Sequence, residues 1–300
     1  MPAAKLYQTS HIKPRRHRST ADEVDQRRTG IWRIVEKIQP ATVRQVFYQA
    51  SVHGLVEKTE GGYAKVQTDL VWMRRAGFIP YDWLADSTRW MRKPRSHSSI
   101  AEALEETARL YRKNLWHSAG SYVEIWLEKD ALAGVLAPIT YQFDVPLMVA
   151  RGYASLSFLH GAAENISEQG KPAYIYHLGD FDPSGVDAGR KIEATLREMA
   201  PNAEINFERL AVVPWQIAEW NLPGRPTKLT DTRAKAFGDH DSVELDSIPP
   251  DVLRNLVSDA ISRHLPASEL AVLKTAEASE RAILADIVGV LTDSGGAAAQ

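Results

Sequence analysis

The chain has 300 residues, of which 44% are hydrophobic, and this is enough to form two packed domains. It contains no cysteine, which excludes a disulfide framework, a thiol nucleophile and a zinc site built on cysteine. No apolar run reaches membrane-spanning length and the N-terminus shows no secretory leader, so we expect a cytoplasmic protein without membrane contact.

The formal net charge of -2 conceals an asymmetry along the chain. Residues 1–95 hold 18 Lys and Arg against 9 Asp and Glu, a balance of +9, whereas the other residues hold 18 basic and 29 acidic side chains, a balance of -11. This indicates a polyanion-binding module followed by a domain with another task, although two ordinary surfaces also produce such counts. Residues 1–21, with the segment "HIKPRRHRST", are expected to be a flexible basic tail.

Three helices are predicted within residues 22–95. The first runs from Asp22 to Ile38, the second begins after an N-cap at Thr42, and the third follows a Gly-Gly turn from about Tyr63. The next segment, "YDWLADSTRW", is predicted to be short extended structure. Three helices and a small β element, rich in arginine, indicate a winged-helix domain that binds double-stranded DNA, although small helical domains without DNA look similar.

The third helix supplies the candidate DNA contacts. We expect phosphate contacts from four of its side chains, Tyr63, Lys65, Arg74 and Arg75. The tryptophans of this basic part are expected to anchor the core, with stacking on bases as the alternative. They are Trp72, Trp83 and Trp90.

After a linking helix predicted at residues 96–118, residues 119–265 alternate between strands and helices. The four predicted strands are "SYVEIWLEK", "VPLMVARG", "PAYIYHLGD" and "INFERLAVV", and a helix follows each of the first three. Short apolar strands that alternate with helices predict an α/β fold with a mostly parallel sheet covered by helices on both faces. Residues 266–300 are predicted to form a C-terminal helix and a disordered tail.

Carboxylates stand where two of these strands end. Glu128 ends the first strand, and Asp180 and Asp182 follow the third in "LGDFDPSG". Because working groups of parallel sheets gather at the carboxyl ends of the strands, we expect the three to meet. Converging like charges need a cation, and oxygen-only ligands select Mg²⁺ or Mn²⁺, which would stabilise charge on a phosphoryl oxygen. The competing interpretation is that "DPSG" is a favourable turn and nothing more.

Other catalytic motifs fit the chain less well. It has no GxxxxGK[ST] phosphate loop, no serine nucleophile elbow and no HExxH pair. The Asp pair of the haloacid-dehalogenase pattern belongs on the first strand of its domain, whereas here the pair follows the third.

These motifs resemble a known family. "WLEKDALA" followed by "LGDFDPSG" is similar to the toprim domain, the metal-binding fold of topoisomerases, bacterial primases and overcoming-lysogenization-defect nucleases. "VRQVFYQ" resembles the active-site segment of the topoisomerase VI A subunit and the meiotic double-strand-break transesterase, in which a winged-helix, CAP-like domain precedes the toprim domain. "ARGYAS" and "SVELDSIPPDVLRNLV" resemble further segments of that family, and the chain looks most like its compact, stand-alone bacterial relatives.

The resemblance implies a type IIB topoisomerase-like DNA transesterase. Tyr48 would attack a DNA phosphodiester and keep the 5′-phosphate, while Arg44 would orient or stabilise the phosphate. Glu128, Asp180 and Asp182 would hold Mg²⁺, or Mn²⁺. A phenol ionises at about pH 10, so the attack needs a nearby cation or base. Family members are homodimers that share each active site between subunits, and any strand passage would need a separate ATPase subunit.

Departures from the family keep two alternatives open. The family usually has an Asp after the Arg, where this chain has Gln45. The toprim subunit of a plasmid-defence condensin system cuts DNA without relying on a tyrosine, so a nuclease that uses metal-activated water is one alternative, and a non-catalytic DNA-binding protein is the other. Tyr48 could also be a core residue. Neighbours in a helix point about 100° apart, so we expect Phe47 to fill the core and Tyr48 to be partly exposed.

Overall fold

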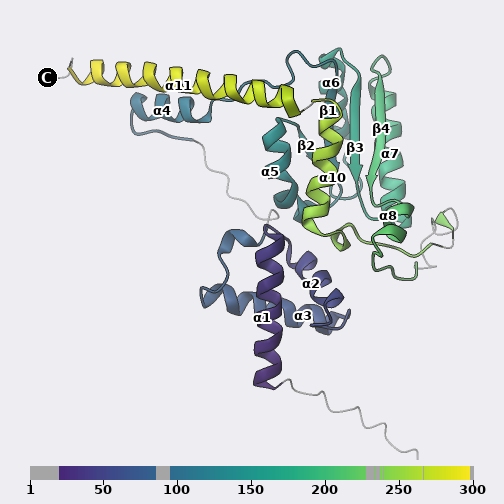
Figure 1. The fold of residues 1–300 in the computed structure, drawn as a ribbon. Helices are drawn as coiled ribbons and strands as arrows, with labels where there is room; N and C mark the ends of the chain where they lie inside the picture. Colours follow the sequence, from purple (N-terminus) through teal and green to yellow (C-terminus); the bar gives the residue numbers. More distant parts are fainter. Residues whose placement is uncertain are drawn as a thin grey trace, which may run out of the picture.

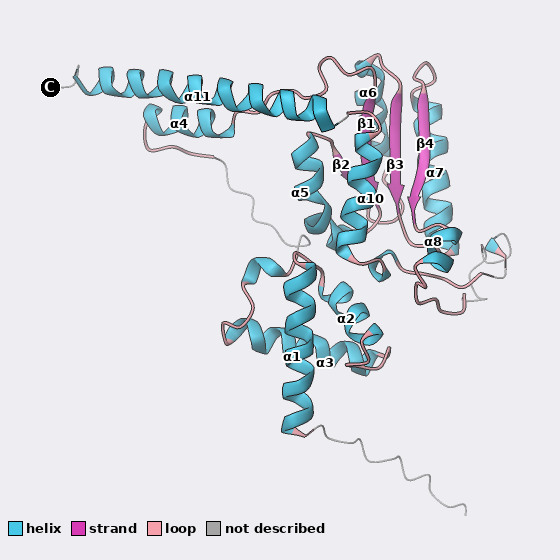
Figure 2. Cartoon of the chain, viewed as in Figure 1, coloured by secondary structure: helices cyan, strands magenta, loops and turns pink. Residues whose placement is uncertain are grey.

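The computed structural model describes residues 20–85, 95–227, 233, 237–238, 240–265 and 267–297 (Figure 1). Three parts of the predictions lie outside these residues: the basic tail before Thr20, the segment "DSTRW" with Trp90, and the last three residues. The described chain is a mixed α/β structure in which helices surround a four-stranded sheet (Figure 2).

Three helices form the N-terminal part: α1 (Ala21–Ile38), α2 (Val43–Val52) and α3 (Glu60–Arg75). Each begins after a threonine whose hydroxyl accepts a backbone N–H of the first turn, a donor that the helix itself leaves unpaired. The caps are Thr20, Thr42 and Thr59. The first two predicted helices and the cap at Thr42 are therefore confirmed.

The third helix begins earlier than predicted, at Glu60. Gly61 and Gly62 lie in its first turn and not in a turn before it. A Cβ at Gly62 would overlap the carbonyl oxygen of Glu57, so glycine there permits the close approach of the preceding loop. Because glycine usually breaks helices, the pattern suggested a later start.

The segment after α3 differs from the prediction of extended structure. Tyr81–Trp83 form a 3₁₀ helix, and Leu84 makes an isolated bridge to Ala41. No strand occurs between residues 20 and 85, all of which the structure describes. The prediction of extended structure is wrong over these three residues, and the winged-helix arrangement stays a prediction.

A buried ion-pair cluster joins α1 to α3. Asp69 is 2% exposed and accepts hydrogen bonds from Nε of Arg27 at 2.6 Å and from Nε of Arg28 at 3.0 Å.

Trp83 packs against the apolar core of the three helices as expected. Trp72 is 43% exposed, so the expectation that it anchors the core is wrong.

The α/β part contains one sheet of four parallel strands in the order β2–β1–β3–β4. The strands are β1 (Tyr122–Leu127), β2 (Leu147–Val149), β3 (Ala173–Leu178) and β4 (Ile205–Ala211). Leu127 lies opposite Leu178 at the carboxyl ends of the two central strands. This register brings the residues that follow both strands to one edge of the sheet, and the four predicted strands are confirmed.

Helices cover both faces of the sheet (Figure 1). One face is covered by α5 (Ala133–Phe143) and α10 (Pro250–Ser262), the other by α6 (Leu156–Gln169) and α7 (Pro183–Met199). Successive side chains of a strand enter opposite cores, as Ile125 and Trp126 do. The predicted α/β architecture is confirmed at this level, and the finer assignment as a toprim domain stays a prediction.

The described residues of the connection from β4 to α10 reach the carboxyl edge of the sheet. It contains α8 (Pro214–Glu219) and ends in a 3₁₀ helix, Leu245–Ser247. Val243 exchanges backbone hydrogen bonds with Phe181, which anchors the connection beside the end of β3.

The helix α4 (Ile100–Leu110) packs along α11 (Ala267–Ala297), and the pair projects from the α/β part (Figure 1). Lys113 Nζ lies 2.5 Å from Glu280 Oε1, and the Tyr111 hydroxyl donates to Glu280 Oε2 at 2.6 Å. None of the helices in the described part of the chain is long and apolar enough to cross a membrane.

We expect Asp69→Ala to lower the free energy of unfolding by about 3–5 kcal/mol, because it leaves two largely buried guanidinium groups without a counter-charge. Urea unfolding followed by circular dichroism measures this loss. The control is Asp82→Ala, at an exposed aspartate, with an expected change within about 0.5 kcal/mol. Equal effects of the two substitutions would show that the cluster does not stabilise the helical part.

Candidate functional site

The carboxyl ends of β1 and β3 bring Glu128 and Asp180 together. The backbone N–H of Glu128 donates to Leu178 O at 2.9 Å, and its Oε2 accepts the backbone N–H of Asp180 at 3.0 Å. Asp182 is the N-cap of α7, and its Oδ1 accepts the N–H of Gly185 at 2.8 Å. The three predicted carboxylates thus surround one strand-to-helix turn.

Two glycines make room for the Glu128 side chain. A Cβ at Gly179 would lie 2.5 Å from Glu128 Oε2. A Cβ at Gly185 would lie 2.9 Å from the same oxygen and would overlap the carbonyl oxygen of Asp180. The glycines of "LGDFDPSG" are therefore required by the packing of the acidic edge.

Arg209 of β4 fixes the backbone of this turn. Its guanidinium donates to the carbonyl oxygens of Gly179 at 3.0 Å, Asp180 at 2.5 Å and Gly185 at 3.2 Å. Its Nε donates to Val212 O at 3.0 Å. Sequence reasoning missed this residue, because a single Arg at the end of a strand carries no motif.

Burial and neighbouring charges raise the pKa of two of these carboxyl groups, Glu128 and Asp180. Burial and the charges of Asp180 and Asp182 raise the pKa of Glu128 to about 7. Burial also raises the pKa of Asp180, although the ammonium group of Lys129 opposes that shift. This edge of the sheet therefore favours a bound cation.

Glu128, Asp180 and Asp182 suit Mg²⁺ or Mn²⁺ by donor type, because all their ligand atoms are oxygens at one edge. Within the described residues, however, no group of three or more side chains is arranged to hold a metal ion. The hydrogen bonds explain this, because Glu128 turns to the backbone of Asp180 and Asp182 turns to the start of α7. The predicted ligands are thus neighbours, and their side chains would have to turn to converge on an ion.

Lys129 is a cation that contacts the acidic edge directly. Its Nζ lies 3.0 Å from Asp180 Oδ1, 2.6 Å from Asp246 Oδ2 and 3.3 Å from Glu244 Oε2. Burial opposes the charged form, but these carboxylates outweigh it and raise the pKa of Lys129. None of the three residues Lys129, Glu244 and Asp246 was predicted as a site residue. The signals were the segment "SVELDSIPPDVLRNLV", which contains Glu244 and Asp246, and the segment "WLEKDALA", which contains Lys129.

The helix α2 contacts the same acids from the other side. Arg44 Nη1 lies 2.5 Å from Glu244 Oε2, and the Thr42 hydroxyl lies 3.3 Å from Asp246 Oδ1. Arg225, in the connection after α8, places its Nη1 3.3 Å from Glu244 Oε1. The boundary between the helical and α/β parts is therefore a network of charged groups.

Tyr48 is 6% exposed, so the prediction that it would be partly exposed is wrong. Phe47 packs in the core of the helical part as expected, whereas Tyr48 lies at the border with the α/β part. Burial and the charge of Glu244 raise the pKa of Tyr48 to about 12, although Arg44 and Lys129 oppose this. In this arrangement Tyr48 is a protonated phenol at neutral pH.

Two cavities flank the ion pair between Arg44 and Glu244. One cavity, of about 480 Å³, is lined by Tyr48, and the other, of about 570 Å³, is lined by Asp180. Both residues of the ion pair line both cavities, as does Tyr63. The ion pair therefore separates the predicted nucleophile from a predicted metal ligand.

The four predicted phosphate contacts of α3 do not lie together. Tyr63 lines both cavities at this boundary, and Arg74 lines the one that Asp180 also lines. Lys65 lines a different hollow beside Arg27, and Arg75 is exposed in the last turn of the helix. The structure brings two of the four residues to the site.

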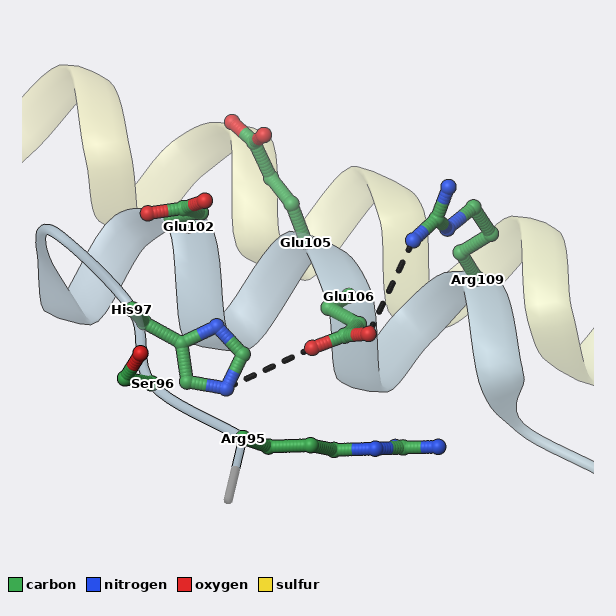
Figure 3. Close-up of a pocket in the computed structure, with 7 residues that line it drawn as sticks. All are labelled: Arg95, Ser96, His97, Glu102, Glu105, Glu106 and Arg109. Carbon is green, nitrogen blue, oxygen red and sulfur yellow. Dashed lines mark ion pairs between the residues drawn. The ribbon is translucent and has the colours of Figure 1, made fainter. Parts of the chain in front are cut away.

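A separate polar hollow of about 560 Å³ lies at the start of α4 (Figure 3). Nε2 of His97 lies 3.3 Å from Oε2 of Glu106, and Nη2 of Arg109 lies 3.8 Å from Oε1 of the same carboxylate. None of the predicted site residues lines this hollow.

No protein-family model matches the chain, and a search of the curated proteins finds no match. The resemblance to the topoisomerase VI A subunit therefore stays an expectation from short motifs.

We expect Gly185→Ala to lower the free energy of unfolding by about 1–3 kcal/mol, because the added methyl group overlaps the carbonyl of Asp180 and the turn must shift. The matched control is Gly161→Ala in α6, where the added Cβ has no neighbour within 4 Å. Alanine favours a helix over glycine, so the control should stabilise the protein by up to about 1 kcal/mol. Thermal denaturation compares them, and a stabilised Gly185→Ala variant would contradict the tight turn.

Proposed function

We propose that the chain binds double-stranded DNA between its helical and α/β parts and breaks it by transesterification, in a reaction that depends on Mg²⁺ or Mn²⁺. The observation that carries this proposal is the pair of adjoining cavities, one lined by Tyr48 and the other by Asp180. A nucleophile and an acidic edge that can take a metal are the parts that such cleavage requires. The motif resemblance supports the same activity.

Tyr48 would be the nucleophile. Its phenolic oxygen would form a bond to the phosphorus of a DNA phosphodiester, and the bond from phosphorus to the 3′ oxygen would break. The products would be a 5′-phosphate on Tyr48 and a free 3′ hydroxyl group, and the proton lost by the phenol balances the proton gained by the leaving oxygen. Because the pKa of Tyr48 is raised to about 12, the attack requires that the charge of Glu244 withdraws or that a cation approaches.

The remaining groups would bind and stabilise the phosphate. Arg44 would donate two N–H groups to phosphate oxygens, the geometry in which guanidinium binds this group most strongly. Glu128, Asp180 and Asp182 would hold Mg²⁺ or Mn²⁺, which when bound supplies stabilisation of negative charge on the phosphoryl oxygens.

The partners belong to the same proposal. The chain would act as a homodimer on the nucleoid in the cytoplasm, with a separate ATPase subunit if strands are passed. Tyr48 lies next to Glu244 of its own chain. A shared active site would therefore require that the acidic edge of the partner subunit replaces this contact.

The burial of Tyr48 favours a second candidate, a nuclease that hydrolyses DNA with metal-activated water. A buried phenol with a raised pKa is a poor nucleophile, and hydrolysis does not need it. Glu128, Asp180 and Asp182 would hold the metal in this reaction as well, and the metal would supply activation of the water.

We expect the protein to form a covalent DNA adduct on supercoiled plasmid in the presence of Mg²⁺ or Mn²⁺. After SDS is added, the broken DNA should migrate freely only after protease treatment. Tyr48→Phe and Asp180→Ala should each abolish the adduct, since one lacks the nucleophile and the other a metal ligand. Tyr141→Phe is the matched control, at a tyrosine that is 66% exposed on α5, and it should cleave as the wild type does.

Other outcomes would identify the alternatives. Cleavage that persists in Tyr48→Phe, is lost in Asp182→Ala and ignores protease would replace the transesterase with the nuclease. DNA binding without cleavage by any metal would leave a non-catalytic DNA-binding protein.

We expect Arg74→Gln to weaken DNA binding more than Lys65→Gln, because Arg74 lines one of the two boundary cavities and Lys65 lines neither. Each lost phosphate contact should reduce the slope of log affinity against log salt by about 0.9. Fluorescence anisotropy of a labelled duplex at several salt concentrations measures both quantities. The reverse order would place the DNA on the outer face of α3.

A further inference from the structure

Three cationic side chains share the carboxylate of Glu244. Arg44 Nη1 lies 2.5 Å and Lys129 Nζ 3.3 Å from its Oε2, and Arg225 Nη1 lies 3.3 Å from its Oε1. Burial alone would raise the pKa of Glu244, but Lys129, Arg44 and Arg225 outweigh it and lower the pKa. Glu244 is therefore a fixed negative charge that three cations contact, and one of them, Lys129, also contacts Asp180 and Asp246.

The cations are more accessible to solvent than the acid that they surround. The side chain of Glu244 is 9% exposed, compared with 46% for Arg44, 56% for Arg225 and 21% for Lys129. A ligand from solution can thus reach the cations while Glu244 is still in place. Their elements are far apart in sequence, namely α2, the end of β1 and the connection after α8, so it is the fold that makes them converge.

The location of Glu244 suggests the ligand. It lies between the cavity that Tyr48 lines and the cavity that Asp180 lines. A DNA strand that passes from one cavity to the other would cross the position of the Glu244 carboxylate. A phosphodiester carries the same single negative charge and offers arginine the same pair of oxygen acceptors.

We propose that Arg44, Lys129 and Arg225 form a binding site for one phosphodiester group of DNA, and that Glu244 occupies this site until DNA displaces it. The inference rests on the proposed function and deepens it, because it adds Lys129 and Arg225 to the phosphate-binding residues. Displacement of Glu244 would join the two cavities. It would also remove a charge that raises the pKa of Tyr48.

The test is DNA binding without cleavage, measured by fluorescence anisotropy of a short labelled duplex in EDTA at several salt concentrations. Glu244→Gln preserves the size of the side chain and removes its charge. We expect it to bind the duplex at least about tenfold more tightly, because a DNA phosphate no longer has to displace the charge of Glu244 from the three cations. Arg225→Gln should bind at least about fivefold more weakly, with a salt slope smaller by about 0.9.

The matched control is Glu60→Gln. Glu60 lines the same cavity as Tyr48, and its substitution removes the same charge, but no ion pair joins it to the three cations. We expect its affinity to change by less than about threefold, the effect of one general surface charge.

The outcomes separate this inference from the proposed function. If the wild type binds DNA and Glu244→Gln binds no more tightly than Glu60→Gln, the inference is overturned while the proposed function stands. If neither the wild type nor any variant binds DNA, the proposed function fails and the inference fails with it. Circular dichroism shows whether each variant folds, and if Glu244→Gln does not, an unchanged affinity of Arg225→Gln would overturn the inference.

Discussion

Lys129 and the carboxylates around it join the two halves of the molecule. The lysine follows β1, and its ammonium contacts Asp180 after β3 and Asp246 before α10. Thr42, the N-cap of α2, contacts Asp246 as well, so that one acid contacts both Lys129 at the sheet edge and the helical part. Buried charges are costly when unpaired, so each member of this network holds the others in place.

A second contact fixes the turn between α1 and α2. The guanidinium of Arg254 in α10 donates to the carbonyl oxygens of Ile38, Gln39 and Pro40 at 3.1–3.4 Å. The helical part is thus attached through residues near the C-terminal end of the α/β part. The width of the boundary where Tyr48 and Asp180 lie therefore depends on residues about 200 positions away from α2 in the sequence.

The sequence predicted the sheet edge well, because its signals are local. Four apolar runs between helical segments give the strands, and parallel pairing then places Glu128 and Asp180 together.

The role of Glu244 could not be predicted in this way. It lies in an irregular connection, and its partners Arg44 and Lys129 are 200 and 115 residues away. The exposure of Tyr48 was predicted wrongly for a related reason. Helical periodicity describes the faces of one helix, whereas the burial of Tyr48 depends on contact with the α/β part. The packing of α4 on α11 also lacked a local signal.

Arg209 gives the acidic edge a rigidity of its own. Four backbone carbonyl groups, those of Gly179, Asp180, Gly185 and Val212, accept from one partly buried guanidinium. The turn that carries the carboxylates is consequently ordered when the chain folds and not when a ligand arrives. A ligand at this edge would then lose little affinity to the conformational entropy of the backbone, and only side chains would need to reorient.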